Sequence, residues 1–277
     1  MNKVSTVFKL VALFAVAIIL GSTLATSLVS ADKLTKLANS VTSDATNTIG
    51  TAGNTGSIGI ASNPNPNVST CNNNSTQELQ TIITRGNQEI NRRLASLSKL
   101  STLISSASKL TPSDQTYLQN EVSSTVSGLQ TLQTQLDSAT TVCTARTDAQ
   151  NIFSEYRVYA LVVPKVWLVK EADDQQVAEA KLSTLAGDLQ TRLTNAGSGV
   201  PNLSQLQSDL TSMQSEISSA QSISSSVESS VIYLTPSDYD LNHSVLEGYN
   251  TQLKTARQDN QQALAYAKDI TAGLKKT

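Results

Sequence analysis

Large and charged side chains are scarce in this chain of 277 residues. Only 4% of its residues are aromatic and 15% are charged, while Ser, Thr, Gln and Asn recur throughout. A thick globular core needs more large side chains than this, but a thin core needs only a stripe of Leu, Ile, Val and Ala on each helix. The composition therefore favours slender helical bundles.

Basic clusters are lacking as well. The formal net charge is -2 at pH 7, and no run rich in Lys or Arg follows the first 31 residues. Proteins that bind nucleic acids normally carry a basic footprint. The sequence therefore predicts no nucleic-acid partner.

Histidine and cysteine are too rare for the common catalytic and zinc sites. His243 is the only histidine, and no G-x-S-x-G elbow or other triad setting accompanies it. One His and two distant Cys cannot close a zinc shell, and neither a phosphate-binding Gly-rich loop nor an EF-hand loop is present. The remaining candidates are acids that also suit a first helical turn, namely Glu171, Asp173, Asp174, Asp238 and Asp240. We therefore expect no catalytic residues, no metal and no cofactor.

Residues 1–31 have the features of a secretory signal. Lys3 and Lys9 accompany an apolar run, and the segment ends in small residues that suit a signal peptidase. The sequence predicts cleavage before Asp32 and a location outside the cell or in the cell envelope. The alternative is an uncleaved anchor, because residues 7–25 almost reach the ~20 residues that span a bilayer. The protein would then meet the membrane only through residues 1–31.

Residues 32–74 predict a flexible tether. Their central part is rich in Gly, Asn, Ser and Thr, contains two prolines and lacks sustained periodicity. Such composition buries too little apolar surface to offset the entropy of ordering.

Residues 75–143 predict a helical hairpin, because apolar residues recur every seven positions. The first helix carries Ile83, Ile90, Leu97 and Ile104, with Leu79, Leu100 and Ala107 beside them. The second carries Val122, Leu129 and Leu136, with Leu118, Leu132 and Ala139 beside them. Gly86, Arg93 and Thr125 interrupt these rows.

The five letters LTPSD occur twice, at residues 110–114 and 234–238. In each copy the threonine suits a helix N-cap, the proline the first helical position, and the aspartate the return bond of a capping box. The predicted cap residues are Thr111, Pro112, Asp114, Thr235, Pro236 and Asp238. The repeat predicts a duplicated hairpin, with the second copy at residues 200–277, where Ser224 and Asn260 are the polar exceptions in the apolar rows.

Residues 144–199 predict a middle helical segment with a break near Pro164. A short strand pair over residues 158–170 is the alternative, because β-branched and aromatic residues concentrate there. In residues 171–196 the predicted inward row is Ala178, Leu182, Leu185 and Leu189. Four aromatic residues form either a packing anchor or, where exposed, an interaction patch: Phe153, Tyr156, Tyr159 and Trp167. The predicted fold class is thus all-α, with long antiparallel hairpins packed like coiled coils.

Cys71 and Cys143 are the only cysteines, and an exported chain with an even count is a candidate for a disulfide. A turn at Thr111 brings both to the open end of the first hairpin. Cys143 also continues the inward row of the second helix. We therefore predict a Cys71–Cys143 disulfide.

Two stretches carry a resemblance. They are FSEYRVYALVVPKVWLVKEAD at residues 153–173 and LTPSDYDLNHSVLEGYNTQLKTARQDNQQALAYAKDI at residues 234–270. In these the chain resembles secreted helical-hairpin proteins of actinobacteria and candidate-phylum bacteria, a group without an established activity. The resemblance implies a bacterial origin and export, and it carries over no catalytic residue.

The leading hypothesis is a non-enzymatic scaffold or interaction protein of the cell envelope or exterior, with a protein or cell-wall partner. The alternative is a membrane-active helical protein similar to pore formers, prompted by the apolar residues 159–170. An enzyme ranks third. Small residues such as Ala256, Ala263 and Ala267 suit packing within one chain or between chains, so a homo-oligomer stays open.

Overall fold

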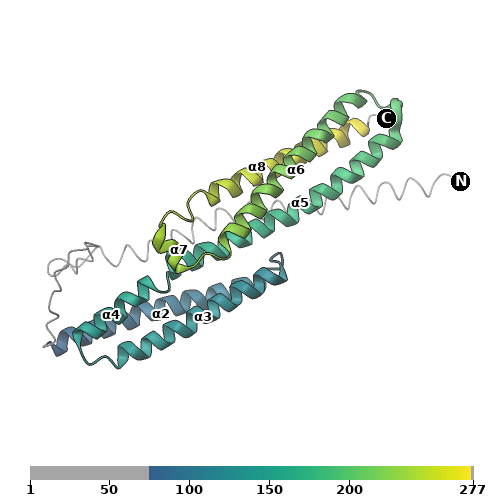
Figure 1. Cartoon of the computed structure of the whole chain (residues 1–277). Helices are drawn as coiled ribbons and strands as arrows, with labels where there is room; N and C mark the ends of the chain where they lie inside the picture. Colours follow the sequence, from purple (N-terminus) through teal and green to yellow (C-terminus); the bar gives the residue numbers. More distant parts are fainter. Residues whose placement is uncertain (1–74, 276–277) are drawn as a thin grey trace, which may run out of the picture. The chain divides into compact units, whose positions relative to one another are not determined.

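The computed structural model describes residues 75–275, and these residues are almost entirely helical (Figure 1). The predicted signal, the tether and Cys71 lie outside the described residues. No strand occurs between residues 75 and 275, so the strand alternative for residues 158–170 is wrong. The all-α prediction is confirmed.

The helices follow one another with short connections. Their bounds are α2 Thr76–Ser106, α3 Pro112–Asp137, α4 Val142–Ser154, the π-helical turn η1 Val158–Val162, α5 Val163–Ala196, the 3-10 turn η2 Gly197–Gly199, α6 Leu203–Val231, α7 Pro236–Leu241 and α8 Tyr249–Leu274.

Helices α2, α3 and α4 pack together, and we call them the N-terminal group. Asn87 of α2 donates to Asp137 of α3 at 2.6 Å, and Gln115 of α3 donates to the carbonyl of Ile104 at 2.9 Å. Partner numbers on α3 fall as numbers on α2 rise, so the two helices are antiparallel. Most of the predicted apolar rows are buried between them, as are Gly86 and Arg93, which the sequence marks as interruptions.

Helices α5, α6 and α8 form the C-terminal group. Ser219 of α6 donates to Asp259 of α8 at 2.7 Å, while Leu206 near the start of α6 lies against Gly273 near the end of α8. These two helices are therefore antiparallel as well. The rows predicted on them are largely buried, with Ser224 and Asn260 fully enclosed.

The predicted middle segment is instead divided between the two groups. Helix α3 ends at Asp137, so Cys143 does not continue its inward row but lies in the first turn of α4. The break falls before residue 158 and not at Pro164. Arg157 has a left-handed backbone (φ 41°), and the Val163 N–H then bonds the carbonyl of Val158, five residues back. This wide turn accommodates the proline ring, so the helix continues through Pro164.

The two LTPSD copies start helices of different length. Helix α3 runs for 26 residues, whereas α7 has only 6. After α7 the Asn242 side chain accepts from the Ser244 N–H at 3.0 Å, which bends the chain into a turn. Gly248, with φ 88°, then leads into α8. The repeat therefore duplicates only the helix start. After the second copy, a short helix and a turn come before the next long helix.

Close approach of α2 and α3 predicts an unusual sensitivity at Gly86. A Cβ there would lie 2.4 Å from Cδ2 of the fully buried Leu136. We expect Gly86→Ala to lower the free energy of unfolding by about 1–3 kcal/mol through overpacking. Gly187→Ala is the matched control, because nothing lies within 4 Å of its added Cβ; it should stabilise by about 0.5–1 kcal/mol. Thermal unfolding followed by circular dichroism measures both, and equal effects would contradict the packing described.

Candidate functional site

The two groups share one apolar core and also meet at a polar junction. One chain segment, between α4 and α5, joins them covalently. The junction is built from Lys109, Thr111, Asp114 and Glu121 on the N-terminal side and from Lys165, Asp173, Asp174 and Glu228 on the C-terminal side.

A buried lysine lies at one end of this junction. Lys165 of α5 is only 1% exposed, and its ammonium binds Glu121 of α3 at 2.5 Å and the carbonyl of Leu234 at 2.6 Å. Burial raises the pKa of Glu121, and the Lys165 ammonium offsets part of that rise. One ammonium thus ties α3, α5 and the segment that follows α6 together. Loss of either charge would leave the other buried and unpaired, which is costly.

The two LTPSD corners differ in how they complete their caps. At the second corner, Asp238 accepts the backbone N–H of Thr235 at 2.8 Å, which closes a capping box. At the first corner, the equivalent N–H of Thr111 donates at 2.9 Å to Asp173, a residue of α5. The start of α3 is therefore completed by a side chain 62 residues away.

Asp173 belongs to a cluster of carboxyls from three helices. It is 2% exposed, and Asp114 of α3 is 8% exposed. Burial raises the pKa of Asp173 to about 7; the Thr111 N–H opposes the rise, while Asp114 and Glu228 of α6 add to it. Burial, assisted by Asp114, also raises the pKa of Glu228. The cluster therefore holds its negative charge unfavourably.

The nearest lysines pair with a different acid. Lys170 binds Asp174 at 2.7 Å, and Lys109 lies 3.7 Å from the same carboxylate. Among the described residues no ion pair forms at Asp173 itself.

A second polar layer crosses the core of the C-terminal group. Ser224 of α6 donates to Glu179 of α5 at 2.9 Å, and Asn260 of α8 donates to Gln175 of α5 at 2.9 Å. Gln175 in turn donates to Glu171, which also pairs with Arg257. Burial raises the pKa of Glu179, and the hydrogen bonds from the serine and asparagine oppose that rise.

The predicted aromatic patch is mostly packed, and two of its members, Phe153 and Tyr159, lie against one arginine. The guanidinium of the buried Arg93 lies 4.5 Å from the ring of Phe153 and 5.2 Å from that of Tyr159. Tyr156 lies against Gly128 of α3, and Trp167 is half-buried on α5. Phe153 is the most exposed of them, at 45%.

Partly or fully exposed aromatic residues lie on α7 and just before and after it in the chain, and Tyr233 also contacts Tyr117 of α3; we call these residues, together with Leu241, the corner surface. The rings of Tyr117 and Tyr233 meet edge to face at 5.1 Å, as do those of Tyr239 and His243. Leu241, the last residue of α7, is the remaining member and is exposed. The predicted capping acid Asp238 bonds the Thr235 N–H, and Asp240, two residues further on, pairs with Arg157 at 2.6 Å.

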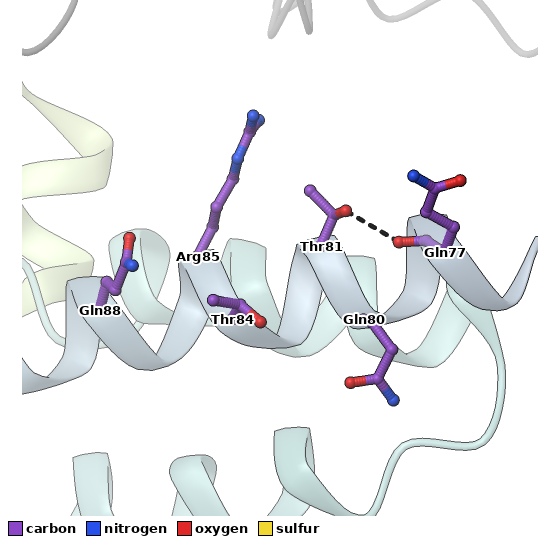
Figure 2. A pocket seen from close by; sticks show the side chains of 6 residues that line it. All are labelled: Gln77, Gln80, Thr81, Thr84, Arg85 and Gln88. Carbon is purple, nitrogen blue, oxygen red and sulfur yellow. Dashed lines mark hydrogen bonds between the residues drawn. The ribbon is translucent and has the colours of Figure 1, made fainter.

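A shallow hollow along α2 has no comparable chemistry. Its lining residues all come from that one helix and are polar: Gln77, Gln80, Thr81, Thr84, Arg85 and Gln88. Figure 2 shows them spread along the helix, with Thr81 hydrogen-bonded to the Gln77 backbone. They do not converge on a point where a substrate could be held.

Residues 75–275 contain no cluster of three or more His, Cys, Asp or Glu arranged to hold a metal ion. None of their helices combines the length and apolar character that a membrane span needs. Within the stretch that prompts the membrane-active alternative, the apolar residues Leu161, Val162, Val166, Leu168 and Val169 are buried.

Sequence reasoning missed the polar residues inside α5. Ala178 and Leu185 are only half-buried, whereas Gln175, Glu179 and Ala186 are buried. The available signal was the spacing, because positions 175, 179, 182, 186 and 189 advance by three or four like any helix stripe. Because positions 175 and 179 hold Gln and Glu, the sequence analysis did not recognise this row as buried.

The buried Glu179 predicts a stability that falls as the pH rises. Its folded-state pKa lies above the unfolded one, so its stabilising contribution is complete below the unfolded pKa and is lost as the pH rises through the folded pKa. Glu179→Gln should therefore gain stability relative to the unmodified protein, by about 1 kcal/mol near pH 8, and gain less near pH 5. Asp188→Asn, on an exposed position of α5, is the control and should stay within about 0.5 kcal/mol. Chemical denaturation at both pH values tests this, and a pH-independent difference would contradict it.

Comparisons with protein-family models, with curated proteins and with solved structures find no match for this chain. The resemblance to secreted helical-hairpin proteins therefore stays an expectation based on the two stretches quoted above. Function has to be inferred from the junction, the polar layer and the corner surface.

Proposed function

We propose that this chain is an exported, non-enzymatic helical scaffold whose corner surface binds a protein or cell-wall partner at the cell envelope. The corner surface is the observation that carries the proposal. Leu241 is 85% exposed and Tyr233 is 64% exposed, whereas the apolar seams of the long helices are buried.

Such residues suit a contact surface on physical grounds. Tyrosine offers a large apolar ring and a hydroxyl, and aromatic residues are enriched at protein interfaces. The two edge-to-face ring pairs, Tyr117–Tyr233 and Tyr239–His243, hold their members in defined orientations. A partner that binds there would therefore meet side chains that have already lost part of their rotational freedom.

Export and a disulfide are part of the same proposal. Arg146 of α4 forms an ion pair with Glu78 of α2, so the first turns of these helices are neighbours. Cys143 lies one turn before Arg146, and Cys71 precedes Glu78 by seven residues. This arrangement supports pairing of the two cysteines, although Cys71 lies outside the described residues.

The export proposal predicts a specific mass. We expect protein recovered from its host to begin at Asp32 and to gain about two mass units on reduction, as one disulfide requires. Intact mass spectrometry of the culture-medium and membrane fractions measures both. A membrane-held species that retains Met1 would make residues 1–31 an anchor, and a mass unchanged by reductant would exclude the Cys71–Cys143 bond.

The binding proposal predicts that the corner surface is required for attachment. We expect the mature protein to co-sediment with actinobacterial cell walls or to self-associate in ultracentrifugation. The double variant Tyr233→Ser, Leu241→Ser should weaken either association about tenfold or more, as loss of interface anchors does. Phe153→Ser, an exposed aromatic outside the corner surface, is the matched control. Equal loss in both variants would contradict the assignment, and absence of any association would leave the scaffold proposal without support.

A further inference from the structure

We propose that the junction is a pH-sensitive hinge: the carboxyls of Asp114, Asp173 and Glu228 add to the apolar packing and ion pairs between the two helical groups when they share a proton, and this added contact weakens when the proton leaves. This inference does not rest on the proposed envelope function.

The covalent connection at the junction is a single segment with an irregular backbone. The chain passes between the groups once, through residues 155–157, and Arg157 there has a left-handed backbone with φ 41°. Non-glycine residues seldom adopt this backbone conformation, and the surrounding structure has to hold them in it. Its guanidinium is held by Asp240 at 2.6 Å and lies 5.5 Å from the ring of Tyr239. The π-helical turn η1 follows directly, and such turns interrupt regular helical hydrogen bonding.

A buried acid contributes to the noncovalent contacts at the hinge, beside the apolar core that the two groups share and the Lys165–Glu121 ion pair. Asp173 uses Oδ2 to accept the Thr111 N–H, while its buried Oδ1 has no hydrogen-bond partner among residues 75–275. Two ionised carboxylates cannot hydrogen-bond to each other, because both are acceptors only. A proton on Asp173 supplies the missing donor toward Asp114, which already accepts the Thr111 hydroxyl at 2.6 Å. Protonation therefore converts a repulsive contact across the junction into a bond.

The charged groups around Asp173 come from every helix that borders the junction. The carboxyls of Asp114 of α3 and Glu228 of α6 both raise the pKa of Asp173. The basic neighbours have other partners, since Lys109 and Lys170 face Asp174, and Lys165 faces Glu121. On the α8 side Arg257 pairs with Glu171. Ionisation of Asp173 therefore adds a negative charge to the cluster without a cation to balance it, and the upward shift in the pKa of Asp173, to about 7, agrees with this geometry.

The sign of the effect follows from the protonation equilibrium. Asp173 has an ordinary pKa of 3.8 and a folded-state pKa of about 7. The closed junction therefore keeps its full stabilisation below about pH 4 and loses it as the pH rises toward and through 7. A change in the pH of the surroundings near neutrality would alter the hinge.

Trp167 provides a local probe, because it is the only tryptophan and lies half-buried on α5 between Lys165 and Asp173. We expect the tryptophan emission of the full chain at 25 °C to shift to longer wavelength between about pH 5.5 and about pH 8.5, with a midpoint near 7. The melting temperature should fall by about 5 °C over the same range. Asp173→Asn, which carries no charge, should remove the emission shift.

Two further variants separate the hinge from a general effect of pH. Glu228→Gln should move the midpoint to lower pH, because it removes one negative neighbour of Asp173. Glu179→Gln, in the core of the C-terminal group, should leave the midpoint unchanged. An emission spectrum of the unmodified protein that is constant across this range would overturn the proposal, even if Asp173→Asn fails to fold. The proposal would also be overturned by an Asp173→Asn protein that keeps the full shift.

Discussion

Close approach between helices is the constraint on which the rest of the structure depends. With few large side chains, the chain can bury apolar surface only where backbones come near one another. Gly86 meets Leu136, Gly128 meets Tyr156, and Gly273 meets Leu206. Ala256, Ala263 and Ala267 serve the same purpose on α8. Such thin seams leave long polar surfaces outside them, and they make each group depend on a few contacts that tolerate little added volume.

The seams also explain why polar residues are found inside. A narrow three-helix core has little apolar material to spare, so positions filled by Glu179, Ser224 and Asn260 must satisfy one another across the core. Asn260 Oδ1 still lacks a partner among the described residues. Buried polar layers of this kind restrict which helix faces can meet, because a shifted register would leave the polar side chains without hydrogen-bond partners. Register in the C-terminal group is thus set by hydrogen bonds as well as by shape.

The sequence predicts the helices better than it predicts their grouping. The rows on α2, α3, α6 and α8 are regular in Leu, Ile, Val and Ala, so periodicity is enough to find them. Periodicity fails on α5, where Gln175 and Glu179 occupy buried positions. The proline also misplaces the break, which the sequence predicts near Pro164 but which lies at Arg157. Local sequence patterns could not predict the candidate site at all. Thr111 and Asp173 are 62 residues apart, and the identical letters of the two corners give no sign that one borrows its aspartate from another helix.

That borrowed aspartate has a consequence for the order in which the chain matures. The corner at residues 234–238 contains every group that its capping box needs, so it can form as soon as those residues leave the ribosome. At the corner of residues 110–114, the backbone N–H of Thr111 must wait for Asp173. The N-terminal group therefore acquires the last hydrogen bond of its own helix start only after more than half of the chain has been made. The two LTPSD corners thus differ in what their caps require: one uses only its own residues, and the other needs a residue that is synthesised later.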